Sequence, residues 1–132
     1  MAYKLLVVDD DRDVVETLAK RLRLEGYEVA VAFDGEEALV KVKEENPDCI
    51  LLDLMMPKLN GMEVLKEIRT KFLDKWRPVI IISAKTELDT VKDCYNLDAD
   101  HYLTKPCTFE NILRGVRTMI SLIPIRKEDQ NK

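Results

Sequence analysis

Short runs of hydrophobic residues alternate along this chain with longer segments in which hydrophobic residues recur every three or four positions. A continuous apolar run is typical of a strand buried on both faces, whereas the longer period is typical of a helix with one buried face. The runs predict strands over residues 5–8, 28–32, 49–52, 79–82 and 101–103. The longer period predicts helices over residues 14–22, 35–44, 62–68, 88–95 and 109–120.

Strands that alternate with helices favour one architecture, a parallel sheet covered by helices on both faces. We therefore expect an α/β fold of the flavodoxin-like (βα)5 type, in which a doubly wound, five-stranded parallel sheet has the strand order 2-1-3-4-5. Pro124 is expected to end the last helix. This divides the chain into one domain over residues 1–123 and a polar C-terminal tail, or the start of a linker, over residues 124–132.

Composition and charge narrow the class of protein. The chain has 132 residues, of which 46% are hydrophobic, so it can bury a single core and is not a disordered chain. Its 25 acidic and 21 basic residues give a net charge of -4, whereas a nucleic-acid-binding domain needs a surplus of Lys and Arg. We therefore expect no direct binding of nucleic acid by this chain.

Other sequence features bear on the compartment. No apolar stretch approaches the roughly 20 residues that a membrane-spanning helix needs, and the N-terminal residues lack the pattern of a signal peptide. Cys49, Cys94 and Cys107 are widely spaced, and His101 is the one histidine, so neither a disulfide framework nor a zinc site is expected. We expect a cytoplasmic protein that does not contact membranes.

Acidic residues follow two of the predicted strands. Asp9, Asp10 and Asp11 come directly after the first strand, and Asp53 comes directly after the third. These strands are neighbours in the expected order, and the carboxyl ends of parallel strands share one edge of the sheet. Two carboxylates about 4 Å apart repel each other by about 4 kcal/mol at an effective dielectric constant of roughly 20. A hard divalent cation such as Mg²⁺ would offset this repulsion.

The other strand ends carry residues that could complete a site. Ser83 and Ala84 follow the fourth strand, and Lys105 and Pro106 follow the fifth. Each also has an ordinary structural explanation, because a serine can cap a helix, a lysine can lie on the surface and a proline can set a turn. Asp11, likewise, is explained most simply as the N-cap of the first helix. Their joint occurrence at successive strand ends favours a functional site.

The motifs at the strand ends match one family in combination. They are Leu6-Val7-Val8-Asp9-Asp10-Asp11, Asp53-Leu54-Met55-Met56-Pro57 with Gly61, Ser83-Ala84, and Tyr102-Leu103-Thr104-Lys105-Pro106. Together they resemble the CheY-like receiver domain of bacterial two-component response regulators. The resemblance runs from about Lys4 to Ile123 and covers nearly the whole chain.

The resemblance implies a phosphoacceptor and a metal site. Asp53 would accept a phosphoryl group from the phosphohistidine of a sensor kinase. Asp9, Asp10, Asp53 and the main-chain carbonyl of Met55 would hold Mg²⁺, for which Mn²⁺ could substitute. The chain would catalyse only its own phosphorylation and dephosphorylation, and it would not otherwise be an enzyme.

The resemblance also implies how the phosphoryl group is bound and read. Lys105, the hydroxyl of Ser83 and the backbone of Ala84 would contact the phosphoryl oxygens, and the Lys105-Pro106 peptide bond would be cis. Ser83 would move toward the phosphoryl group, and Tyr102 would rotate into the space that Ser83 leaves. Taken without the resemblance, Tyr102 is explained as a half-buried tyrosine on a strand.

The partners implied are a sensor histidine kinase or a phosphotransfer protein, and an output partner or domain. The output would dock on the face formed by the fourth helix, the fifth strand and the fifth helix. The chain would be a monomer or a dimer that depends on phosphorylation, and it would stand alone or be a module cut from a longer response regulator or hybrid kinase. Val91, Asn111 and Gly115 stand where the winged-helix branch tends to carry charges for dimerisation, which argues against that form of dimer.

Two positions depart from the family's pattern, and two others are positions that affect the rate of dephosphorylation in the family. Asp98 replaces the usual glycine, so it should adopt a left-handed conformation at modest cost. Cys107 replaces a large apolar residue, and we expect it to be small, buried and unreactive. Met55 and Lys85 occupy positions that orient or exclude the water that hydrolyses the acyl phosphate. Because a methionine side chain hydrogen-bonds water poorly, we expect slow dephosphorylation.

Two other families share parts of this pattern. A flavodoxin-like, FMN-binding electron carrier has the same architecture, but its first strand is followed by a Ser-, Thr- or Gly-rich phosphate-binding loop, where this chain has three aspartates. A phosphatase of the haloacid dehalogenase type needs a second aspartate two residues after its nucleophile, where this chain has Met55. Both families are therefore disfavoured.

Overall fold

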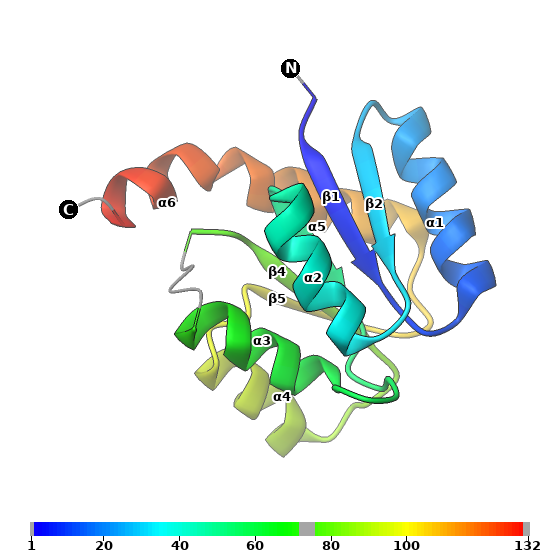
Figure 1. The fold of residues 1–132 in the computed structure, drawn as a ribbon, viewed down its shortest axis with the longest axis vertical. Helices are drawn as coiled ribbons and strands as arrows, with labels where there is room; N and C mark the ends of the chain where they lie inside the picture. The colour runs from blue at the N-terminus through cyan, green and yellow to red at the C-terminus, as the bar shows by residue number, and fades with distance from the viewer. Residues whose placement is uncertain (1, 72–75, 131–132) are drawn as a thin grey trace.

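The predicted strands form one parallel sheet. In the computed structural model, which describes residues 2–71 and 76–130, the strand order is β2-β1-β3-β4-β5 (Figure 1). Each pair of neighbouring strands is parallel, which confirms the flavodoxin-like (βα)5 architecture. The strands are β1 (Lys4–Val8), β2 (Glu28–Ala32), β3 (Cys49–Leu52), β4 (Val79–Ser83) and β5 (His101–Thr104).

Helices cover both faces of this sheet. α1 and α5 lie on one face, whereas α2, α3 and α4 lie on the other (Figure 1). None of the described helices is both long enough and apolar enough to span a membrane. The helices are α1 (Arg12–Leu24), α2 (Gly35–Glu45), α3 (Gly61–Thr70), α4 (Leu88–Asn96), α5 (Phe109–Ser121) and α6 (Ile123–Gln130).

The register of the central strands sets the position of the residues that follow them. β1 lies between β2 and β3, and Val8 is aligned with both Ala32 and Leu52. The next residues continue this pairing, since the Asp9 N–H donates to the Ala32 carbonyl at 3.2 Å and the Asp53 N–H donates to the Val8 carbonyl at 3.0 Å. Asp9 and Asp53 therefore emerge side by side at the carboxyl edge of the sheet.

Strand side chains alternate between two hydrophobic layers, one on each face of the sheet. Leu6 and Ile50 point into the layer that packs against α2, α3 and α4. Leu5 and Leu51 point into the layer that packs against α1 and α5. These four side chains are at most 1% exposed. Burial on both faces explains why the strands are continuous apolar runs rather than alternating ones.

Two predictions about local backbone structure are confirmed. Asp11 is the N-cap of α1, because its carboxylate accepts the N–H groups of Asp13 at 3.1 Å and Val14 at 3.3 Å. Asp98 is left-handed, with a φ of 65°. Both residues therefore have a structural role that the sequence alone indicates.

The C-terminal segment differs from its prediction. Pro124 does not end the last helix, because α5 ends at Ser121 and a further helix, α6, begins at Ile123. Proline is compatible with the first turn of a helix, where its missing N–H would have no helical partner. Ile123 is only 3% exposed and packs into the layer beneath α1 and α5. The predicted tail is thus helical up to residue 130, and residues 131–132 lie outside the described residues.

The predicted helix over residues 88–95 is confirmed as α4, but it buries little of its apolar surface. Leu88 and Tyr95 are 66% and 45% exposed, and Val91 is only partly buried. Cys94 is the residue of α4 that is buried in the core. The helix has nine residues and lies beside the edge strand β5, so it offers the core a narrow contact. Its apolar spacing identified the helix but not the buried face.

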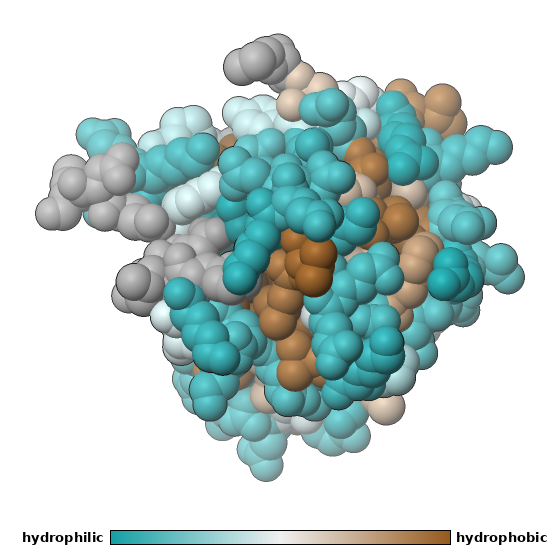
Figure 2. All heavy atoms as spheres, viewed as in Figure 1, coloured by the Kyte–Doolittle hydropathy of each residue, from teal (hydrophilic) through white to brown (hydrophobic). Residues whose placement is uncertain are grey.

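The outer surface over α2 and α3 is largely hydrophilic, with hydrophobic side chains gathered in its middle (Figure 2). Val40 of α2 is 50% exposed. Apolar atoms normally contribute part of the surface of a folded domain. This surface therefore carries no signal comparable to that at the carboxyl edge of the sheet.

Candidate functional site

Three carboxylates meet at the carboxyl edge of the sheet. Asp9 and Asp53 are buried, with 5% and 7% exposure, whereas Asp10 is exposed. One carboxylate oxygen from each of the three lies within 4.8 Å of the others. The structure thus brings together carboxylates that the sequence predicted to converge. The carboxylate of Asp11 instead caps α1.

Backbone groups hold the two buried carboxylates in place. The Asp11 N–H donates to Asp9 Oδ1 at 3.0 Å, and the Met55 N–H donates to Asp53 Oδ1 at 3.3 Å. Gly61 lies against the backbone of Asp53 and Leu54, and a Cβ atom at that position would overlap the Asp53 carbonyl oxygen. The start of α3 can therefore pack this closely behind Asp53 only because residue 61 is glycine.

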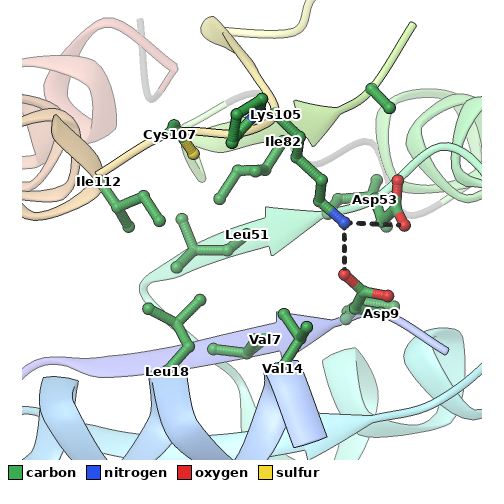
Figure 3. Close-up of a pocket in the computed structure, with 14 residues that line it drawn as sticks. Val7, Asp9, Val14, Leu18, Leu51, Asp53, Ile82, Lys105, Cys107 and Ile112 are labelled. Carbon is green, nitrogen blue, oxygen red and sulfur yellow. Dashed lines mark hydrogen bonds and ion pairs between the residues drawn. The ribbon is translucent and has the colours of Figure 1, made fainter. Parts of the chain in front are cut away.

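Lys105 reaches across the site from the end of β5. Its Nζ lies 2.7 Å from Asp9 Oδ2 and 3.4 Å from Asp53 Oδ2 (Figure 3). The Lys105 N–H donates to the Ser83 carbonyl at 2.8 Å, which fixes the strand end from which the side chain departs. The Lys105-Pro106 peptide bond is cis, as the resemblance implied.

Burial and charge act in opposite directions on the ionisation of this cluster. Burial raises the pKa of the Asp53 carboxyl, and the negative charge of Asp9 adds to the rise, whereas the charge of Lys105 opposes it. For Lys105, burial acts to lower the pKa, but the hydrogen bond to Asp9 and the charge of Asp53 outweigh it, so the pKa is raised. Lys105 is therefore a permanent cation at neutral pH.

The acidic cluster has the chemistry of a site for a hard divalent cation. The ligand atoms offered by Asp9, Asp10 and Asp53 are all carboxylate oxygens, which suit Mg²⁺ and Mn²⁺. Met55 follows Asp53 by two residues, and its side chain is 56% exposed. The residues present therefore fit the metal that the sequence predicted.

Ser83 and Tyr102 are linked through one residue of the loop between β4 and α4. Ser83 is completely buried, and its Oγ accepts the Lys85 N–H at 3.2 Å. The Tyr102 hydroxyl donates to the Lys85 carbonyl at 2.7 Å. The sequence singled out all three residues but gave no sign that the Lys85 backbone joins the other two.

A cavity of about 500 Å³ opens beside the cluster, between α1, α5 and the sheet. Asp9, Asp53 and Lys105 lie at one end of it, and apolar side chains line the rest (Figure 3). Cys107 borders this cavity. It was expected to be buried, but it is only half-buried, because its side chain faces the open space of the cavity. Burial nevertheless raises the pKa of the Cys107 thiol, so it is neutral at physiological pH.

A family model described as the response regulator receiver domain matches residues 5–117 of the chain. The chain belongs to this family. Receiver domains are signalling domains of two-component systems, and the CheY-like fold and the motifs at the strand ends agree with the match. The family assignment also decides against a flavodoxin-like electron carrier and against a haloacid dehalogenase phosphatase.

Solved structures of receiver domains superimpose on nine-tenths or more of the chain. A CheY-like response regulator receiver domain protein from Methanospirillum hungatei has a TM-score of 0.88 at 25% identity, over 98% of this chain and 99% of that one. The receiver domain of the Francisella response regulator 1452 has a TM-score of 0.84 at 34% identity, over 90% of this chain and 97% of that one. The chemotaxis protein CheY4 of Vibrio cholerae has a TM-score of 0.84 at 29% identity, over 90% and 99%.

Proposed function

We propose that this receiver domain accepts a phosphoryl group on Asp53 from the phosphohistidine of a sensor histidine kinase or of a phosphotransfer protein. The observation that supports this most strongly is the meeting of Asp9, Asp10 and Asp53 with Lys105 at the carboxyl edge of the sheet. Asp53 is the member of the cluster that follows β3, at the position where the family has its phosphoacceptor.

The transfer forms one bond and breaks one bond. A carboxylate oxygen of Asp53 attacks the phosphorus atom, a P–O bond forms, and the P–N bond to the imidazole breaks with its electron pair moving to the ring nitrogen. The Met55 N–H holds the other Asp53 oxygen, which fixes the orientation of the nucleophile. Lys105 already lies between Asp9 and Asp53, so its charge is in place to contact a phosphoryl oxygen.

The metal ligands in this proposal are the carboxylates of Asp9, Asp10 and Asp53 together with the main-chain carbonyl of Met55. When bound, Mg²⁺, or Mn²⁺ in its place, would supply positive charge that offsets the charge of the phosphoryl oxygens. The oxygen donors of the cluster support this assignment. The three carboxylates would otherwise repel the incoming phosphoryl group.

The signal would be read on the face formed by α4, β5 and α5. The Ser83 hydroxyl and the backbone N–H of Ala84 would bind the phosphoryl oxygens. A shift of Ser83 would move the Lys85 backbone, to which both Ser83 and Tyr102 are hydrogen-bonded, and so change the position of Tyr102. The exposed Leu88 of α4 gives this face an apolar surface for a partner. The output is a partner protein or domain rather than nucleic acid bound directly by this chain.

We further propose that the chain acts in the cytoplasm, where sensor kinases present their phosphohistidine, as a monomer or as a dimer that forms on phosphorylation. It acts either alone or as the receiver module of a longer response regulator or hybrid kinase. Residues 1–123 would form the receiver domain, with the segment from residue 124 as its C-terminal extension or linker. The isolated chain should be phosphorylated on Asp53 whether it acts alone or as a module of a longer protein.

Intact-mass measurement after incubation with acetyl phosphate and Mg²⁺ tests the proposal. The parent chain should gain the mass of one phosphoryl group, and D53N should gain none. D11N is the matched control, because Asp11 lies at the same edge but caps α1, and asparagine is as good an N-cap as aspartate. D11N should be phosphorylated as the parent is. Equal phosphorylation of D53N and the parent, or phosphorylation unaffected by removal of all divalent metal, would contradict the proposal.

A further inference from the structure

The cavity beside the acidic cluster has the size and lining of a small-molecule site. Its volume of about 500 Å³ falls in the range of roughly 300–1,000 Å³ that ligand pockets occupy, and such pockets are mostly apolar with a few polar groups at one side. The apolar walls come from five elements of the fold. They include Val14 and Leu18 of α1, Val7 of β1, Leu51 of β3, Ile82 of β4 and Ile112 of α5 (Figure 3).

Cys107 leaves this cavity open. Its side chain borders the space near Ile112, on the loop that joins β5 to α5 (Figure 3). The side chain is short and half-buried, and a larger apolar residue at this position would extend into the space that the cavity now occupies. On the opposite rim, Val14 of α1 is 42% exposed, so the cavity is open to solvent between α1 and the loop.

The lining of the cavity restricts the ligand. Its charged side chains, Asp9, Asp53 and Lys105, belong to the acidic cluster at one end, where Lys105 lies 2.7 Å from Asp9 and 3.4 Å from Asp53. The remaining residues of the lining carry no charge, so the body of a ligand meets apolar side chains. A charged group buried against these side chains without a partner would be costly. An uncharged ligand avoids this cost.

We propose that this cavity is a binding site for a small, uncharged, apolar molecule, whose body packs against Leu18, Leu51 and Ile112 and whose edge lies against Lys105. Removal of the ligand's apolar surface from water drives the binding. The site needs no phosphoryl group on Asp53. It can therefore be tested, and can fail, independently of the proposed phosphorylation.

Titration with N-phenyl-1-naphthylamine, an uncharged apolar probe whose fluorescence rises out of water, tests the site. The parent chain should show saturable binding of one probe per molecule. C107S should bind equally, because serine keeps the size of the side chain. C107F should bind about tenfold more weakly or worse, because even one methylene group in a hydrophobic pocket changes affinity by about tenfold or more. L24S, which removes an exposed leucine of α1 outside the cavity, should bind as the parent does.

Methyl NMR of the parent chain locates the probe without relying on any variant to fold. Saturating N-phenyl-1-naphthylamine should shift the ¹³C-methyl signals of Leu18, Ile82 and Ile112, and the methyl signals of the opposite layer should stay in place. Circular dichroism establishes whether C107F is folded, and if it is not, the methyl map decides. Absence of saturable binding, equal binding by a folded C107F, or shifts confined to residues outside the cavity would overturn the proposal.

Discussion

Met55 stands at the solvent side of the acidic cluster, where water must approach an acyl phosphate on Asp53. Its side chain is 56% exposed, and together with Asp10 and Lys85 it lines a surface hollow of about 360 Å³. A thioether sulfur is a weak hydrogen-bond acceptor, so Met55 cannot hold an attacking water in a defined position. It instead covers part of the approach with an apolar group.

We expect M55N to lose its phosphoryl group several-fold faster than the parent, because an asparagine amide can both donate to and accept from water. Release of inorganic phosphate from the purified phosphorylated chain, in the presence of Mg²⁺, measures the rate. M55L is the matched control, since leucine is apolar and of similar size, and its rate should equal that of the parent. Equal rates for M55N and the parent would refute this role for Met55.

At the scale of elements, the N-cap of α2 makes a contribution to stability that depends on pH. The Asp34 carboxylate accepts the Glu37 N–H at 2.8 Å at the start of α2, and Lys58 Nζ lies 3.5 Å from it. The hydrogen bond, followed by the charge of Lys58, lowers the pKa of the Asp34 carboxyl. A lowered pKa in the folded state means that the unfolded chain binds protons more readily, so this contribution to stability rises with pH.

We expect D34A to lower the free energy of unfolding by about 1 kcal/mol at pH 7, the typical value of an N-cap. D34N should lose less, because asparagine caps as well as aspartate. The contribution of Asp34 is complete above its unfolded pKa of about 3.9 and is lost as pH falls through the lower folded pKa. The gap between D34A and the parent should therefore narrow below about pH 4. Urea unfolding of the three proteins at neutral and acidic pH measures it, and a gap that is absent at pH 7 or unchanged in acid would contradict the assignment.

The sequence predicted the strands correctly, because burial on both faces of the sheet makes each strand a continuous apolar run. The prediction that Pro124 ends the last helix is wrong, because proline also fits the first turn of a helix. The apolar spacing of α4 predicted the helix but did not indicate that Cys94 is the residue it buries. A short helix at the edge of a domain is placed by tertiary contacts and not by its own pattern.

The candidate site likewise has parts that the sequence predicts and parts that it does not. Asp9, Asp53 and Lys105 could be predicted because the topology of a parallel sheet brings strand ends together. The hydrogen bond from Tyr102 to the Lys85 carbonyl could not, since it depends on a side-chain rotamer and on the path of a loop. The cavity beside Cys107 could not either, because it depends on how α1 and α5 are spaced across the sheet.

At the scale of the whole molecule, the two ends of the sheet differ: one carries the candidate functional site and the other a cluster of ion pairs. The carboxyl ends of the strands hold the acidic cluster, and the carboxylate of Asp100 lies at the amino ends of β4 and β5. Asp100 Oδ2 accepts from Arg69 Nη2 at 2.9 Å and from the Val79 N–H at 2.7 Å, and Oδ1 accepts from Arg126 Nη1 at 2.6 Å. One side chain thus connects α3, the start of β4 and α6.

We expect D100A to destabilise the protein by about 3 kcal/mol, the typical cost of removing one partner of a buried ion pair, because the side chain of Arg69 is only 4% exposed. R117A is the matched control, since Arg117 and Glu25 form a pair whose side chains are 61% and 38% exposed, and exposed pairs contribute about 0–1 kcal/mol. Urea unfolding compares the two variants. Below the unfolding transition, D100A should still be phosphorylated on Asp53 by acetyl phosphate, because the two carboxylates lie at opposite ends of the sheet. Equal stability of D100A and R117A would show that the amino end is not held together by Asp100, and loss of phosphorylation in folded D100A would show that the two ends are coupled.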